Sequence, residues 1–184
     1  NNAPVLIQGE LGTGKELVAK IIHHIGDWKD YRFCKIDCRV LSEQPFSAQL
    51  SRLFKEFDVG TTPATLYFKE VGYLGQDNDL KLLGLIEDGI FQNGIERKVL
   101  KNLRFISSSS EDLREKVAKG KFSEDLYYRL NTLSIRMPPL RDRVKEISKI
   151  AQYILEEHSK NMKIKKVGIS ENVLMLLQSY WWPG

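Results

Sequence analysis

The chain has few of the features that would place it in a membrane or in a disulfide-bonded class. It contains no apolar run of about eighteen residues, the length that a membrane-spanning helix needs. Cys34 and Cys38 are its two cysteines, too few for a disulfide framework, and no histidine pair near them suits zinc. The adjacent His23 and His24 are expected to be solvated. We therefore expect a reduced cytoplasmic protein with no membrane partner.

The two ends of the chain carry no recognisable targeting signal. Asn1 to Pro4 lacks the basic and apolar regions of a signal peptide, and the end at Pro183-Gly184 interrupts a helical pattern. Both ends are expected to be cuts within a longer protein. The 184 residues are 42% apolar and carry a net charge of +4, which suits one globular core and a small appendage. The positive charge permits nucleotide or nucleic-acid partners, although ordinary solvated lysines are the favoured explanation.

Short apolar runs alternate with segments of helical spacing along most of the chain. Strands are expected at 5–7, 32–38, 66–68, 103–107 and 133–137, and helices at 15–25, 47–57, 80–86, 111–119 and 122–130. Asn93-Gly94 indicates the turn of a hairpin. The alternation predicts an α/β core with a mostly parallel sheet over residues 1–139. Residues 140–184 have only helical patterns and are expected to form a helical lid that is incomplete at its C-terminal end.

A glycine-rich segment links the first expected strand to the first expected helix. Gly9, Gly14 and Lys15 satisfy the P-loop pattern G-x-x-x-x-G-K, whereas Glu16 stands where serine or threonine is usual. Backbone N–H groups of such a loop and the positive end of the following helix bind phosphate, with Lys15 at the β- and γ-phosphates and Thr13 nearby. The predicted nucleotide-binding residues are Gly9, Glu10, Leu11, Gly12, Thr13, Gly14, Lys15, Glu16 and Leu17.

The sequence around this loop is similar to a known family. Residues 5–20 (VLIQGELGTGKELVAK), 122–130 (FSEDLYYRL), 137–143 (MPPLRDR) and 180–184 (YWWPG) resemble motifs of the AAA+ central domain of bacterial enhancer-binding proteins, which act on σ54 RNA polymerase. The resemblance implies a P-loop fold that binds ATP or ADP and self-associates as a dimer or hexameric ring. It also implies a sensor domain, such as the receiver of a two-component system, and a helix-turn-helix for promoter DNA, both outside this chain.

Within this resemblance, the strand that should end in Asp-Glu ends in Lys69-Glu70. Lys69 replaces the aspartate that directs the metal, and a lysine cannot accept a hydrogen bond from metal-bound water. We therefore predict no metal site, and Lys69 is expected to neutralise phosphate directly. Glu70, which would polarise the attacking water, remains as a degenerate catalytic residue. Without an ordered Mg²⁺ the transition state loses much of its charge stabilisation.

Three further positions of the hydrolytic machinery differ from the family pattern. Asp37 replaces an asparagine and is expected to face Glu70, placing two acceptors together. Ser110 replaces the sensor asparagine and is expected to be too short to reach the site. Ser123 replaces the first of two arginines that reach a neighbouring subunit, whereas the second, Arg129, is kept as a possible trans arginine. Together these changes predict a domain deficient in hydrolysis.

The loop that contacts σ54 is also missing from the sequence. Residues 55–64 connect two expected elements directly, without the family's Gly-Ala-Phe-Thr-Gly-Ala motif, which favours a partner polymerase with σ70. Some atypical relatives, the biofilm and flagellar regulators, respond to cyclic di-GMP, and Arg136, Arg141 and Arg143 are candidate contacts for it. Three functions stay open: a regulatory nucleotide switch, an active σ54-dependent ATPase with non-standard metal handling, and a vestigial scaffold.

Overall fold

The computed structural model describes residues 2–42, 46–56, 62–93, 96–164 and 168–183. It divides into two compact units, Asn1–Met137 and Pro138–Gly184, whereas the sequence placed the division after residue 139. Each unit is described by itself.

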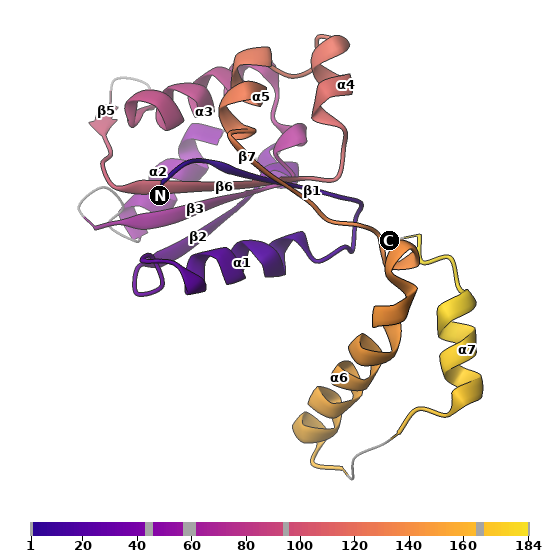
Figure 1. Cartoon of the computed structure of the whole chain (residues 1–184). Helices are drawn as coiled ribbons and strands as arrows, with labels where there is room; N and C mark the ends of the chain where they lie inside the picture. Colours follow the sequence, from indigo (N-terminus) through magenta and orange to yellow (C-terminus); the bar gives the residue numbers. More distant parts are fainter. Residues whose placement is uncertain (1, 43–45, 57–61, 94–95, 165–167, 184) are drawn as a thin grey trace. The chain divides into compact units, whose positions relative to one another are not determined.

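A parallel sheet forms the centre of the first unit (Figure 1). In the described residues it has five strands in the order β2-β3-β6-β1-β7. Their bounds are Val5–Gln8 for β1, Arg32–Asp37 for β2, Ala64–Lys69 for β3, Leu103–Ser109 for β6 and Leu133–Arg136 for β7. Every neighbouring pair is parallel, as the burial of β1, β3 and β6 on both faces requires. The predicted α/β class with a mostly parallel sheet is confirmed.

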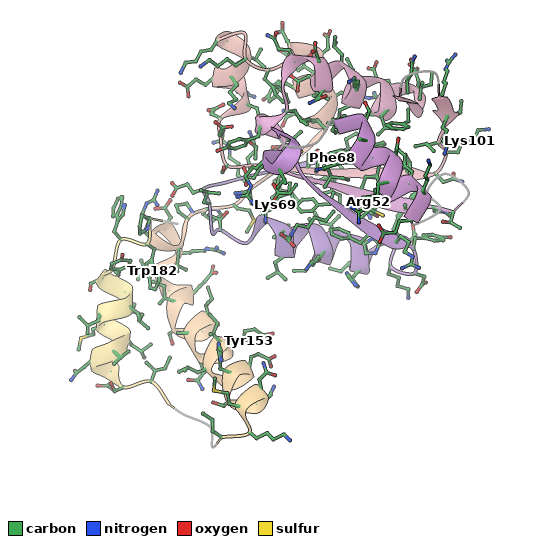
Figure 2. The ribbon with its side chains drawn as sticks, turned by 180° about the vertical axis from the view of Figure 1, so that it is seen from behind. Arg52, Phe68, Lys69, Lys101, Tyr153 and Trp182 are labelled. Atoms are coloured by element: carbon green, nitrogen blue, oxygen red, sulfur yellow. The ribbon has the colours of Figure 1, made fainter. Side chains whose placement is uncertain are left out.

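Helices cover both faces of this sheet (Figure 1). Helix α1 (Lys15–Ile25) packs on one face, where Ala19 meets Ile7, Tyr67 and Ile106. The opposite face carries α2 (Phe46–Glu56), α3 (Gln76–Asp88), α4 (Leu113–Ala118) and α5 (Glu124–Leu130). Alternation along β3 sends Tyr67 and Phe68 to opposite faces. The Phe68 ring, labelled in Figure 2, lies between those of Phe46, 6.3 Å away, and Phe105, 6.5 Å away.

The element boundaries follow local sequence signals. Helix α3 ends at Gly89, which adopts a left-handed φ of 65°. Helix α5 begins after Ser123, whose hydroxyl accepts a hydrogen bond from the Leu126 N–H at 3.3 Å. The predicted hairpin is present as antiparallel β4 (Ile90–Asn93) and β5 (Glu96–Val99), and its Gly94 lies outside the described residues.

The second unit contains a 3₁₀ helix (Leu140–Arg143), α6 (Val144–Met162) and α7 (Glu171–Ser179). After α7, the Trp182 indole N–H donates to the Leu177 carbonyl at 2.8 Å, and the Arg141 guanidinium lies 4.8 Å from the centre of the Trp181 ring. Figure 2 labels Tyr153 on α6, which is exposed, and Trp182 after α7. Among the described residues, no helix is both long and apolar enough to span a membrane.

Candidate functional site

The ends of four parallel strands bring the predicted site residues together. Gly9 follows β1, Asp37 ends β2, Lys69 ends β3, and Ser110 follows β6. Because the strands are parallel, these positions share one edge of the sheet, the place where α/β folds bind ligands. A cavity of about 370 Å³ opens at this edge. It is lined by Leu11, Gly12, Thr13, Gly14, Lys15, Glu16, Arg39, Tyr67, Lys69 and Glu70.

The backbone of the P-loop explains its glycines. Gly14 precedes α1 with a left-handed φ of 92°, a conformation that other residues adopt only with strain. A Cβ atom on Gly9 would lie 2.6 Å from the Met137 carbonyl oxygen, so only glycine fits against that chain segment. Residues 11–16 line the cavity, whereas Leu17 is 63% exposed and does not line it.

Lys15 occupies the centre of the loop. Its Nζ donates to the carbonyl oxygens of Gly9 at 2.7 Å and Glu10 at 2.9 Å, and it lies 3.2 Å from Glu70 Oε1. The residue is buried although it lines the cavity. A phosphate entering the cavity therefore meets a positioned ammonium group beside the N-terminus of α1.

Glu70 is held by the residue that was expected to be too short. Its Oε2 accepts hydrogen bonds from the Ser110 N–H at 2.7 Å and from the Ser110 hydroxyl at 2.6 Å. Ser110 reaches Glu70, which has a left-handed φ of 56°, because the Glu70 carboxylate meets the end of β6 directly. That Ser110 is too short to replace the sensor asparagine stays a prediction. No residue pattern around position 70 indicates this left-handed backbone conformation.

Asp37 does not face Glu70 as predicted. Its two carboxylate oxygens accept from Arg39 Nε at 3.0 Å and Nη2 at 2.7 Å, and Oδ1 also accepts from the Arg39 N–H. These bonds hold the pKa of Asp37 below its usual value, so two clashing acceptors do not arise. Arg39, two residues after Asp37, is the ion-pair partner that the sequence analysis did not identify.

Lys69, labelled in Figure 2, lies near the carboxylates of Glu16 and Asp37. Its Nζ is 3.2 Å from Glu16 Oε2 and 4.0 Å from Asp37 Oδ2. Lys35 also binds Glu16, at 2.8 Å, and the hydrogen bonds from Lys35 and then from Lys69 lower the pKa of Glu16. Both carboxylates near the loop are thus paired with cationic side chains. These residues do not fit a Mg²⁺ ion, which requires oxygen ligands free to coordinate it.

The other predicted residues lie away from this cavity. Ser123 caps α5, and its N–H donates to the buried Asp79 Oδ2 at 3.0 Å. Arg129 is exposed on α5 and lines a separate hollow with Asp125 and Tyr128. The candidate dinucleotide contacts belong to different units: Arg136 to the first, and Arg141 and Arg143 to the second. Arg143 lies 3.6 Å from Glu146.

Comparison with known proteins places this site in a family. Residues 1–140 match the family described as "Sigma-54 interaction domain". The chain is 33% identical to the Nif-specific regulatory protein of Azotobacter vinelandii, covering 100% of this chain and 37% of that protein. It is 34% identical to the HTH-type transcriptional regulatory protein TyrR of Haemophilus influenzae, covering 100% of this chain and 60% of that protein. The chain therefore spans about one to two thirds of these relatives.

Solved structures share the fold over the whole chain. NtrX from Brucella abortus in complex with ATP superposes with a TM-score of 0.86 at 26% identity, covering 100% of this chain and 44% of that one. A complex of NtrX with ADP gives the same TM-score at 25% identity, covering 43% of that chain. Hsp104, at 18% identity and a TM-score of 0.69, is similar in fold alone. The chain therefore belongs to the family of sigma-54 interaction domains and has their AAA+ fold.

Proposed function

We propose that this domain binds ATP or ADP as a regulatory ligand and turns ATP over poorly or not at all. The observation that carries the proposal is the positioned Lys15 in a cavity whose other charged side chains each form an ion pair. NtrX, which shares the fold of this chain, has been crystallised in complex with ATP and in complex with ADP.

The state of Glu70 supports poor turnover. A catalytic base needs an oxygen that can take a proton from the attacking water. In Glu70, Oε1 faces Lys15 and Oε2 accepts two hydrogen bonds from Ser110, and the residue is only 2% exposed. The lysine at position 69 adds no metal ligand, and Ser123 serves as a helix cap instead of reaching a neighbour.

In the longer protein, we propose, nucleotide binding shifts an equilibrium between conformations or oligomeric states. Such a switch requires only that one state bind the nucleotide more tightly than the other. Arg129 is exposed on α5, which supports the proposed role as an arginine that reaches a neighbouring copy. The missing Gly-Ala-Phe-Thr-Gly-Ala motif favours transcription control through σ70 polymerase, with promoter DNA bound by a domain outside this chain.

Calorimetric titration of the 184-residue chain tests the binding function. We expect ATP and ADP to bind with micromolar affinity, and a parallel titration with cyclic di-GMP tests the dinucleotide alternative. Binding of neither ATP nor ADP would refute the proposal and favour a vestigial scaffold. Binding of cyclic di-GMP alone would also refute it and would favour the dinucleotide alternative.

A working σ54-dependent ATPase is the second candidate, because Glu70 and Arg129 are both present. Phosphate release that depends on Lys15, together with binding to purified σ54, would establish that candidate in place of the regulatory switch.

A further inference from the structure

We propose that Lys69 takes the part of the divalent cation, so that this domain binds the nucleotide's phosphates without Mg²⁺. The inference rests on the proposed nucleotide-binding function and defines the form of the ligand: the metal-free anion rather than its magnesium complex.

The first support is the position of Lys69. It ends β3 beside the P-loop, lines the same cavity as Lys15, and keeps 26% of its side chain exposed. A lysine ammonium is a compact charge with three donors, which suits phosphate oxygens. Lys15 and Lys69 thus present two ammonium groups to one cavity, at the edge where a metal complex would need free carboxylates.

The second support is that Glu16 and Asp37 keep other cationic partners when Lys69 moves away from them. Glu16 also binds Lys35 at 2.8 Å and lies 3.7 Å from Lys20. Asp37 is held by the bidentate Arg39, and Lys69 is its more distant partner at 4.0 Å. When Lys69 turns to a phosphate, neither carboxylate becomes a buried unpaired charge, so the exchange has a low electrostatic cost.

The third support is that Glu70, the carboxylate partner of Lys15, is also held by a second residue. Glu70 Oε1 contacts Lys15, but its Oε2 is held separately by the backbone and hydroxyl of Ser110. Lys15 also keeps the Gly9 and Glu10 carbonyls as anchors. Both lysines can therefore shift from a carboxylate to a phosphate while the surrounding network stays in place.

The experiment measures the dissociation constant for ATP and for ADP, once with excess Mg²⁺ and once with EDTA. In the unaltered chain we expect Mg²⁺ to leave the constant unchanged or to weaken binding, because the metal reduces the ligand's negative charge and is repelled by Lys69. Tightening by Mg²⁺ of about tenfold or more would overturn the inference. Failure of both nucleotides to bind in either buffer would instead overturn the nucleotide-binding function itself.

Variants at two lysines separate a specific role from general charge. Lys69→Met should weaken metal-free binding by about tenfold or more, the effect of one charge-assisted hydrogen bond. Lys119→Met is the control, because Lys119 is exposed, pairs with Glu115 and does not line the cavity. It should change the constant by less than about threefold, since an exposed distant charge is screened. Equal losses in both variants would contradict a specific role for Lys69.

The reverse substitution gives a positive readout. Lys69→Asp restores a metal-compatible carboxylate at the end of β3. We expect its metal-free binding to weaken and its binding to become tighter when Mg²⁺ is added, the opposite of the unaltered chain. Metal-free binding as tight as that of the unaltered chain would show that Lys69 does not contact the phosphates.

Discussion

The two sides of the cavity use different parts of the chain. The phosphate side, residues 9–15 and the start of α1, depends on backbone conformation at glycines and on Lys15. The hydrolytic side, at the ends of β2, β3 and β6, depends on the side chains of Asp37, Lys69, Glu70 and Ser110. On the first side the backbone arrangement of a P-loop is complete. On the hydrolytic side, the side chains form ion pairs and hydrogen bonds with one another or with their neighbours.

This difference shows why binding and turnover can separate within one fold. A phosphate site built from N–H groups and a helix end needs no particular side chain beyond the lysine. Turnover needs several side chains in register, each with a defined charge. Replacing side chains at this edge need not disturb the sheet, because Asp37 and Lys69 are the last residues of their strands and are only partly buried.

Removing the lysine of the phosphate side should have the largest effect. Lys15→Met is expected to weaken ATP binding by about a thousandfold, because it deletes the ammonium group that meets two phosphates. Isothermal calorimetry measures the change, and Lys20→Met on the same helix is the control, since Lys20 does not line the cavity. If Lys15→Met bound ATP as tightly as the unaltered chain, the distinction between the phosphate side and the hydrolytic side would be wrong.

Asp79, on α3 and away from the cavity, makes the stability of the first unit sensitive to pH. It is fully buried beneath the start of α5, and burial raises its pKa to about 6 from 3.8. Between about pH 4 and pH 6 the folded chain therefore holds a proton that the unfolded chain has released, so stability falls as pH rises through this window. The loss should reach about 2–3 kcal/mol above pH 6.

Chemical denaturation across this pH range tests the effect. Asp79→Asn keeps an acceptor for the Ser123 N–H but cannot titrate, so its stability should lack this part of the slope. The difference in slope between the two proteins is the readout, because the substitution also changes the absolute stability. Parallel curves for the two proteins would show that Asp79 does not titrate in this window.

Ser110 should contribute the smallest of these effects. Ser110→Ala removes one of the two hydrogen bonds to Glu70 Oε2 and leaves the backbone N–H bond intact. We expect a loss of about 1–2 kcal/mol in unfolding free energy, as for a hydrogen bond to a charged group, measured by urea denaturation. Ser134→Ala, at an exposed position of β7, is the control. An unchanged stability would mean that Ser110 does not hold Glu70.

The fold and the backbone conformation of the glycine-rich loop were predictable from sequence because both have local signals, whereas phosphate binding by that loop stays a prediction. Apolar runs marked the strands, and the glycine spacing with Lys15 marked the loop. The partners of Asp37 and Glu70 were not predictable in the same way. They depend on a left-handed residue at position 70 and on the direction of Arg39, which no periodicity encodes.

Helix α1 shows that apolar spacing alone does not predict which face of a helix is buried. Its apolar residues Leu17 and Ile25 follow the helical spacing that predicted the helix, yet they are 63% and 81% exposed. His23, expected to be solvated, is buried instead, and its Nδ1 lies 2.9 Å from the Thr65 hydroxyl. Burial also lowers the pKa of His23. The buried face of α1 runs through Lys15, Ala19 and His23, because the position of Lys15 in the loop sets the rotation of the helix.

The most direct test of the separation between binding and turnover uses one sample of the unaltered chain with ATP labelled at the γ-phosphate. Bound nucleotide and released phosphate are measured together, with Lys15→Met as the background. We predict that ATP binds, that Lys15→Met abolishes binding, and that phosphate release does not exceed the Lys15→Met background. Repeated turnover that disappears in Lys15→Met would contradict the account.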